Sequence, residues 1–245
     1  MDFFKKIYFE ARYFAKRIRP TRPIILMYHR VADDKNDPHL LCVSPENFRK
    51  HLEILKQKKN IIPLSKILDK NIPKNSVAIT FDDGYADNLH TALPILKELS
   101  APATIFIAAG LLGQRFHWDD KQSSGRAISE VELKSLAIEP LVEIGSHTMT
   151  HPHLSELSRG GQKEEIEKSK KVLESIIGEQ ILSFAYPFGD LNQISISLVK
   201  EARYKIACAV RAESVREKSD PFSLPRFIVR NWDQKKFEKK INIFK

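Results

Sequence analysis

The chain has 245 residues, 42% of them hydrophobic, and carries a formal net charge of +9. A chain of this length can bury one sizeable core, and its apolar runs stay below the roughly 18 residues that a membrane-spanning helix needs. Residues 23–233 contain 28 basic and 28 acidic side chains, so the excess positive charge is at the two ends. A neutral central part argues against nucleic-acid binding, and we expect one soluble domain.

Residues 1–22 carry seven Lys or Arg and two acids, and their apolar residues recur at helical spacing. They lack the continuous apolar core and cleavage site of a secretory signal. Two interpretations stay open: a helix packed on the domain, or a basic amphipathic helix on an anionic membrane surface. Residues 234–245 repeat the pattern.

The two cysteines, Cys42 and Cys208, are isolated and follow no metal or redox spacing, which favours a reducing compartment. We therefore expect a cytoplasmic protein. If the basic helix lies on a membrane surface, we expect peripheral contact with the inner face of the membrane.

The first predicted strand covers residues 23–31 and ends in a polar triplet, Tyr28, His29 and Arg30. A serine N-cap at Ser44, followed by proline, predicts a helix through residue 59. Residues 61–64 are a short strand that leads to a brief helix.

The next strand ends in two adjacent carboxylates, Asp82 and Asp83, followed by Gly84. Successive side chains of a strand point to opposite faces, so both acids can share one site only if the strand stops and the chain turns at Gly84. Like charges that close repel unless a cation lies between them. The pair indicates either a metal site, with one carboxylate bound and the other free as a base, or a solvated turn.

A helix at residues 88–100 and a strand at 103–108 follow, and then a loop-rich insertion at 110–127. After a helix at 129–136, a second apolar strand ends where His147 and His151 lie four residues apart. Two histidines and one carboxylate with open positions left over form a common catalytic metal set. The two strand ends together therefore predict a metal centre.

The rest of the chain continues the alternation of strands and helices. We predict a long charged helix at 155–177, a strand at Phe184, a helix at 193–204, and strands at 205–210 and 224–229. About eight short strands with intervening helices indicate an α/β fold with parallel strands. When parallel strands close into a barrel, the functional residues lie at the C-terminal ends of the strands. The aspartate pair and the histidine pair both lie at such ends.

Three stretches resemble the motifs of the polysaccharide deacetylases, the NodB-like carbohydrate esterases of family 4. They are Thr-Phe-Asp-Asp-Gly at 80–84, His-Thr-Met-Thr-His at 147–151, and Phe-Ala-Tyr-Pro-Phe-Gly at 184–189. Residues 28–31 resemble the start of the circularly permuted branch, which includes exopolysaccharide deacetylases. The resemblance implies a distorted (β/α)7-type barrel in a single domain, residues 23–233, flanked by the basic segments 1–22 and 234–245.

The resemblance also implies roles for individual residues. The first aspartate of the family is the general base, and the second aspartate and both histidines bind a divalent metal. A backbone N–H group in the third motif helps to hold the oxyanion that forms during the reaction. By position these roles fall on Asp82, on Asp83 with His147 and His151, and on Phe188, with Tyr186 in the same motif as a candidate for substrate binding.

Two roles in that family have no direct match here. No histidine near the C-terminus matches the general acid, and His29 is our candidate for it, with capping of a strand as the alternative. Ala185 stands where an arginine usually orients the base, and Arg226 is the candidate replacement, with a surface ion pair as the alternative. Trp118, in the insertion, is a candidate for stacking on a sugar ring or for local packing.

The function implied is hydrolysis of the N-acetyl group of an N-acetylhexosamine in a glycan or surface-polysaccharide intermediate. Zinc is the expected metal, with cobalt, nickel and manganese as alternatives. We expect the rate to fall as Asp82 gains a proton and as His29 loses one. The alternatives are a deacylase of a lipid-linked sugar or other non-peptide C–N bond, a sugar-binding relative without activity, and a non-haem iron oxygenase.

Overall fold

The computed structural model describes residues 22–119 and 122–242. The predicted N-terminal helix, apart from Arg22, lies outside the described residues. The strands are β1 (Ile24–Tyr28), β2 (Arg30–Val31), β3 (Cys42–Val43), β4 (Asn60–Ile61), β5 (Ser76–Phe81), β6 (Ala103–Ile107), β7 (Val142–Ser146), β8 (Ser183–Ala185), β9 (Ile206–Cys208) and β10 (Phe227–Ile228). The α-helices are α2 (Pro45–Lys58), α3 (Leu93–Glu98), α4 (Glu130–Ala137), α5 (Arg159–Ile177), α6 (Gln193–Glu201) and α7 (Gln234–Ile241).

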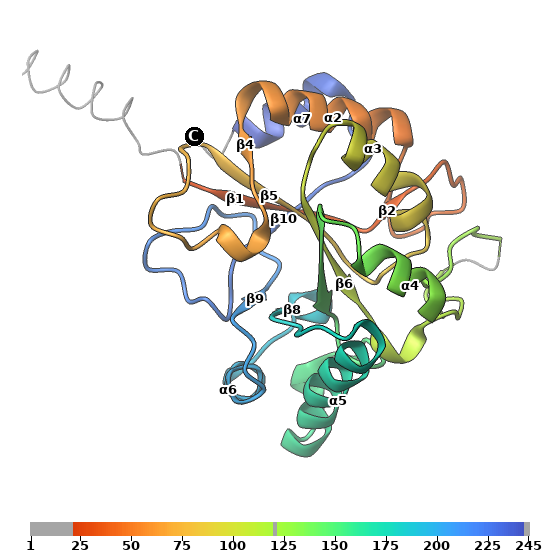
Figure 1. Ribbon diagram of the computed structural model, residues 1–245, viewed down its shortest axis with the longest axis vertical. Coiled ribbons are helices and arrows are strands. Elements are labelled where there is room, and N and C mark those ends of the chain that lie inside the picture. Colours follow the sequence, from red (N-terminus) through yellow and green to blue (C-terminus); the bar gives the residue numbers. More distant parts are fainter. Residues whose placement is uncertain (1–21, 120–121, 243–245) are drawn as a thin grey trace, which may run out of the picture.

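The main sheet is a curled, parallel one, with the order β10-β1-β5-β6-β7-β8-β9 and β4 added beside β5. A bridge between Cys208 and Leu224 draws the β9 edge toward the segment that leads into β10. The helices lie outside the sheet, with α2 and α7 on one side and α5 and α6 on the opposite side (Figure 1). This arrangement confirms the predicted single-domain, distorted barrel.

The strand register brings the predicted motifs to one end of the barrel. Tyr28 pairs with Phe81, so β1 and β5 end side by side, and the N–H of Asp82 donates to the Tyr28 carbonyl at 3.0 Å. Ser146 pairs with Ile107, so His147 leaves β7 at the same level. Every residue of β1 and β5 is buried, as expected of strands covered on both faces.

Some predicted helices begin or end differently in the structure. The helix expected at 88–100 begins with a π-helical turn, Asn88–Ala92, and continues as α3. Pro94 explains this break, because proline has no N–H for the carbonyl four residues before it. The long helix begins at Arg159 rather than at 155, with Ser158 as its N-cap, and ends at Gly178 as predicted.

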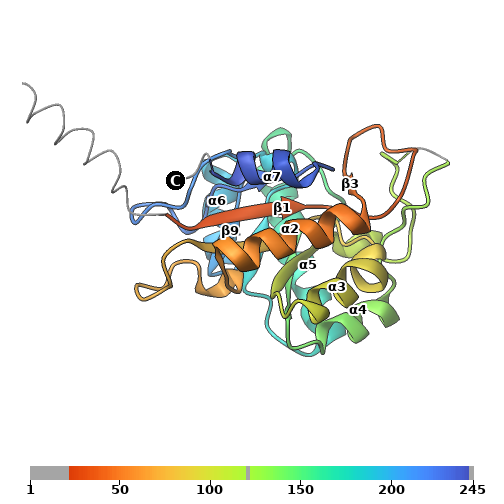
Figure 2. The same ribbon diagram turned by 90° about the horizontal axis from the view of Figure 1, so that it is seen from above.

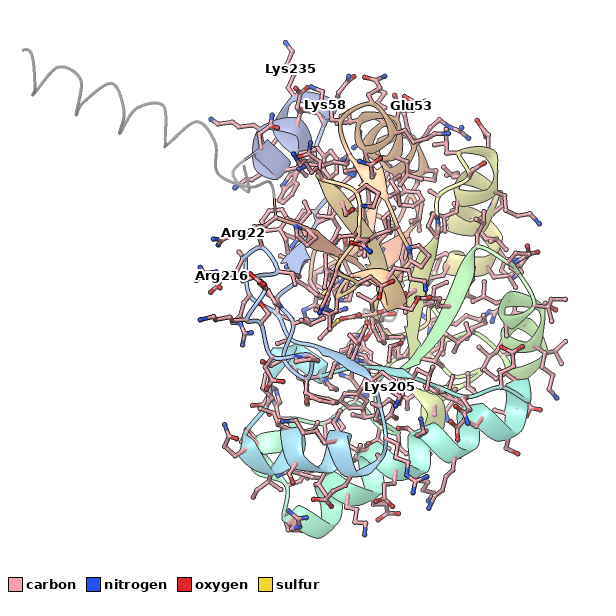
Figure 3. All side chains as sticks on the ribbon, turned by 60° about the vertical axis from the view of Figure 1, so that its left-hand side comes forward. Arg22, Glu53, Lys58, Lys205, Arg216 and Lys235 are labelled. Atoms are coloured by element: carbon pink, nitrogen blue, oxygen red, sulfur yellow. The ribbon has the colours of Figure 1, made fainter. Side chains whose placement is uncertain are left out.

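Helix α7 packs against α2 beside β1 (Figure 2). Its apolar residues Phe237 and Ile241 are buried, so the side of α7 that a membrane would need is already covered. Lys235 of α7 and Lys58 of α2 are both at the surface (Figure 3). Lys58 pairs with Glu238 of α7. Among the described residues there is no helix with the length and hydropathy to span a bilayer.

His51 connects α2 to the C-terminal segment and makes the fold sensitive to acid. It is fully buried, stacks on Phe237 at 3.9 Å, and its Nε2 lies 2.7 Å from the Trp232 carbonyl. Burial lowers the pKa of His51 to about 4. The folded chain therefore holds a neutral ring at pH values where the unfolded chain is protonated.

We expect the free energy of unfolding to decrease as the pH falls from about 6.5 to about 4, by up to about 3 kcal/mol from His51. Urea unfolding at several pH values measures this slope. His51→Gln should reduce it, and His153→Gln, whose ring is half exposed, is the control. Equal slopes in the parent and in His51→Gln would contradict the assignment.

Candidate active site

The two aspartates after β5 face one cavity because the backbone turns sharply there. Strand β5 stops at Phe81, and Asp83 and Gly84 both have positive φ, 72° and 78°. A Cβ on Gly84 would lie 2.7 Å from Cδ1 of Ile107, so only glycine fits at that position. The turn expected from the sequence is therefore present.

Arg226 holds Asp82 in a bidentate ion pair. Its two terminal nitrogens lie 2.6 and 2.7 Å from the carboxylate oxygens of Asp82. The guanidinium also donates to the Thr80 hydroxyl and the Ala209 carbonyl, at 3.1 and 3.2 Å. Arg226 is fully buried, so it is not the surface ion pair considered as the alternative.

Asp83, His147 and His151 form a candidate metal site, with three ligand atoms within 4.8 Å of one another. Oδ1 of Asp83 lies 3.5 Å from Nε2 of His147 and 3.3 Å from Nε2 of His151. Nδ1 of His147 lies 2.7 Å from the Ala185 carbonyl, which fixes the ring with its Nε2 lone pair toward the site. These donors suit zinc or a similar divalent ion.

The loop that carries the two histidines is anchored by a residue that sequence reasoning missed. Glu165, on α5, accepts hydrogen bonds from the backbone N–H groups of Met149 and Thr150, at 2.8 and 2.9 Å. Within the loop, Thr148 and His151 both have positive φ, so the histidine spacing is built on a strained backbone. A charged residue 14 positions after His151 gives no signal of this contact in the sequence.

The candidate catalytic residues line a cavity of about 340 Å³. Its wall includes His29, Trp118 and Phe188 from the predicted set, together with Asp82, Asp83, His147 and His151. Trp118 and Phe188 lie against the His151 ring, with ring centroids 4.5 and 4.6 Å away. Sequence reasoning did not name the other lining residues, which are Met27, His39, Leu41, Val210, Ile228 and Arg230.

The third motif is divided between the core and the cavity. Tyr186 is fully buried, and its hydroxyl donates to the Phe222 carbonyl at 3.0 Å, so its side chain does not line the cavity. Phe188 has a φ of 59° and a side chain that is 57% exposed. The positive φ turns the backbone of Phe188 at the cavity rim, where the sequence predicts an oxyanion contact.

The surroundings of the two aspartates shift their pKa values in opposite directions. Burial raises the pKa of Asp82, but Arg226 and His147 more than offset this and bring it to about 2. For Asp83, burial and the nearby Asp82 and Asp119 raise the pKa well above its usual value. A bound cation would favour the ionised form of Asp83, so the site is suited to a metal on Asp83 and a free carboxylate on Asp82.

Trp118 is fixed by a hydrogen-bond chain from the insertion. Its indole N–H donates to the Tyr85 hydroxyl at 3.1 Å, and that hydroxyl donates to Oδ1 of Asp119 at 2.9 Å. Arg30, below the insertion, pairs with Asp34 and Asp87 and lies over the Tyr85 ring. The polar end of the first strand thus supports the wall that carries Trp118.

We expect Tyr85→Phe to raise KM with little change in kcat, because Trp118 loses its anchor but the catalytic groups stay in place. Removing the hydroxyl leaves buried polar groups unpaired and should cost about 1–3 kcal/mol of stability. Steady-state kinetics and urea unfolding measure both effects. Tyr186→Phe is the matched control, because it removes a buried hydroxyl away from the cavity. A similar KM change in both variants would contradict the role of Tyr85.

Comparison with known proteins identifies the family. The family model for polysaccharide deacetylases matches residues 69–207, more than half of the chain. The chain belongs to the polysaccharide deacetylase family. It is a hydrolase acting on carbon–nitrogen bonds other than peptide bonds, as predicted.

Relatives of this deacetylase include the Bacillus subtilis protein YxkH, 27% identical over 217 residues, which cover 86% of this chain and 72% of the relative. The poly-β-1,6-N-acetyl-D-glucosamine N-deacetylase of Staphylococcus aureus is 30% identical over 166 residues. That match covers 64% of this chain and 55% of the relative, so the chain spans about half the length of the Staphylococcus protein.

Two solved structures share the fold of this deacetylase. The Streptococcus pyogenes deacetylase PplD, in complex with acetate, has a TM-score of 0.77 at 22% identity and covers 91% of this chain and 99% of that one. IcaB from Ammonifex degensii has a TM-score of 0.76 at 20% identity and covers 91% and 97%. At these identities the likeness establishes the barrel alone.

Proposed function

We propose that this deacetylase hydrolyses the N-acetyl group of an N-acetylhexosamine in a glycan, with a divalent metal on Asp83, His147 and His151. The observation that carries the proposal is the convergence of this triad with the Arg226-bound carboxylate of Asp82 in one cavity. The substrate named for the Staphylococcus relative supports a polymer of N-acetylglucosamine. A bound divalent ion would polarise an acetyl carbonyl and lower the pKa of a water molecule beside it. Zinc is the first choice for this donor set.

The residues of the chain then have distinct tasks. Asp82 stays ionised through neutral pH and is held in one orientation by Arg226, so it can accept a proton from the attacking water. We assign to the backbone N–H of Phe188, a residue that lines the cavity, a hydrogen bond to the oxyanion of the tetrahedral intermediate, a type of contact worth about 3 kcal/mol. Trp118 and Phe188, whose rings both lie against His151 and line the cavity, would contact the sugar ring.

His29 is the proposed donor to the leaving amine, but it does not begin as an acid. Burial lowers its pKa to about 4, against the opposing effect of Asp82 and with Arg226, His147 and Arg230 lowering it further. The ring is therefore neutral at pH 7 and must collect a proton during the reaction before donating it. The proton that Asp82 takes from the attacking water passes to His29 and from there to the leaving amine.

This changes the pH dependence expected from the sequence. We now expect kcat/KM of the zinc-loaded enzyme to rise as the pH increases through about 4 and to stay level from about 5 to neutrality. A nearby metal ion lowers the pKa of His29 further and extends the level region. A decline between pH 5 and 7 that disappears in His29→Ala would show instead that the protonated ring is the reactive starting form.

Acetate release from N-acetylhexosamine oligomers and lipid-linked sugars tests the proposed function. The protein is stripped of metal, assayed, and assayed again after reloading with zinc. Zinc-dependent release from the oligomers supports the proposal. Preferential release from lipid-linked sugars would favour the alternative substrate class, and oxygen consumption with iron but no acetate would favour an oxygenase.

A further inference from the structure

The turn of the third motif holds a phenylalanine in a backbone conformation that side chains disfavour. Phe188 has a φ of 59°, and Gly189, the next residue, has a φ of 69°. A Cβ on Gly189 would lie 2.7 Å from the backbone nitrogen of Val210, so the turn packs closely against the chain that follows β9. A residue other than glycine keeps a positive φ only where its surroundings hold it there. The contacts of Phe188 therefore decide where this turn lies.

The ring of Phe188 lies against two histidines of the loop that follows β7. It meets the ring of His151 edge-on, with centroids 4.6 Å apart. It stacks flat on the ring of His153, with centroids 4.0 Å apart and an angle of 10° between the two planes. His153 neither lines the catalytic cavity nor belongs to the group of possible metal ligands. The contact with Phe188 is therefore the route by which its ring reaches the cavity.

His153 is itself attached to the core. The next residue, Leu154, is fully buried and begins a short 3-10 helix, Leu154–Glu156. The carbonyl of His153 accepts a hydrogen bond from the N–H of Glu156 at 3.2 Å. Although the side chain of His153 is 48% exposed, the backbone that carries it is anchored. A half-exposed ring on an anchored backbone gives Phe188 a fixed surface to stack on.

Asp190 joins the third-motif turn to the loop after β7 a second time. Its Oδ2 accepts a hydrogen bond from the N–H of Ser155 at 2.8 Å and lies 3.9 Å from Nδ1 of His153. Its own N–H donates to the Pro187 carbonyl at 2.9 Å and closes the turn around Phe188. A ring stack and a carboxylate thus tie the turn to the same loop that carries the two histidine ligands. The turn and the candidate metal site share one support.

We propose that His153 is a positioning residue, which sets the place of the Phe188 N–H relative to the candidate metal site by stacking on the Phe188 ring. This inference rests on the proposed function, in which that N–H donates to the oxyanion. Such a hydrogen bond is effective only over a narrow range of distances, and it forms fully in the transition state rather than with the bound substrate. Loss of the stack should therefore lower kcat more than it raises KM.

His153→Ala tests this by removing the ring from the stack. We expect kcat of the zinc-loaded enzyme for an N-acetylglucosamine oligomer to fall about ten-fold, with KM within about two-fold and zinc content unchanged. His153→Phe keeps a flat ring without the ring nitrogens, so it should restore most of the lost kcat. His90→Ala is the matched control, because His90 is similarly exposed, at 56%, and does not line the cavity. It should leave kcat and KM unchanged.

A double-mutant cycle shows whether His153 acts through Phe188. In the Phe188→Ala background there is no ring to support, so His153→Ala should lower kcat there by less than about two-fold. Urea unfolding of the parent, both single variants and the double variant gives a second readout that does not depend on activity. We expect the two losses of stability to be non-additive. An undiminished loss of kcat in the Phe188→Ala background, or additive losses of stability, would overturn the inference.

The kinetic outcomes separate this inference from the proposed function. No acetate release by the unaltered, zinc-loaded enzyme would contradict the proposed function itself. With an active parent enzyme, an unchanged kcat in His153→Ala would overturn the role of His153 alone. A His153→Phe variant as slow as His153→Ala would do the same, because the stack would then not be what matters.

Discussion

Asp82→Asn should lower acetate release by about 10²–10⁴-fold while zinc stays bound, because the amide cannot accept the proton of the attacking water. Asp82 is not among the three grouped ligands, and its Oδ2 lies 4.0 Å from Nε2 of His147. The asparagine oxygen can still accept one of the two hydrogen bonds from Arg226, and the side chain keeps its size and shape. Turnover and zinc content of the same preparation measure the two parts of this prediction.

Asp87→Asn is the matched control for this variant. Asp87 is also a largely buried carboxylate paired with an arginine, at 2.9 Å from Nε of Arg30, but it does not line the cavity. We expect this variant to lose stability and to keep most of its acetate release. If both variants lost activity to the same extent, the loss would reflect weakened ion pairs rather than a missing base.

Arg226→Met should cost about 3–5 kcal/mol of stability and most of the activity. Its removal leaves the Asp82 carboxylate buried without its cationic partner, and an unpaired buried charge is strongly destabilising. The carboxylate also loses the bidentate contact that sets its orientation. Urea unfolding at pH 7, zinc content and acetate release are measured together, so that a loss of base orientation can be separated from a loss of metal.

Two further substitutions sharpen the result for Arg226. Arg226→Lys keeps the charge but not the planar pair of donors, so we expect stability to recover more than activity. Arg216→Met removes an exposed arginine whose partner Glu213 is 3.9 Å away, and it should cost less than about 1 kcal/mol. Normal turnover in Arg226→Met would exclude Arg226 from the orientation of the base.

The barrel could be predicted because its strands are short apolar runs that end in polar residues. That pattern is local, and parallel strands place their C-terminal ends together, so the ends of β5 and β7 had to meet. Helix limits were less predictable, since the break before Pro94 and the late start of α5 depend on details of single turns. The cytoplasmic location and the membrane contact of residues 1–22 stay predictions.

The metal triad could be predicted for the same reason, but the residues that support it could not. The contact between Arg226 and Asp82 joins positions far apart in the chain. From the sequence, Arg226 was either the replacement for the missing arginine or part of a surface ion pair. Glu165 and the Ala185 carbonyl act through backbone groups, which leave no pattern in the side chains. Tyr186 was expected at the substrate because it belongs to the third motif, yet its ring is buried in the core.

Acetate release as a function of zinc added per chain shows whether deacetylation requires a divalent ion on Asp83, His147 and His151. The metal-free protein is titrated with zinc in the presence of an N-acetylglucosamine oligomer, alongside His147→Gln. We expect release to rise to a maximum at one zinc per chain, and we expect the variant neither to bind this zinc nor to release acetate. Full release without metal, or equal release by His147→Gln, would contradict a metal-dependent reaction at this site.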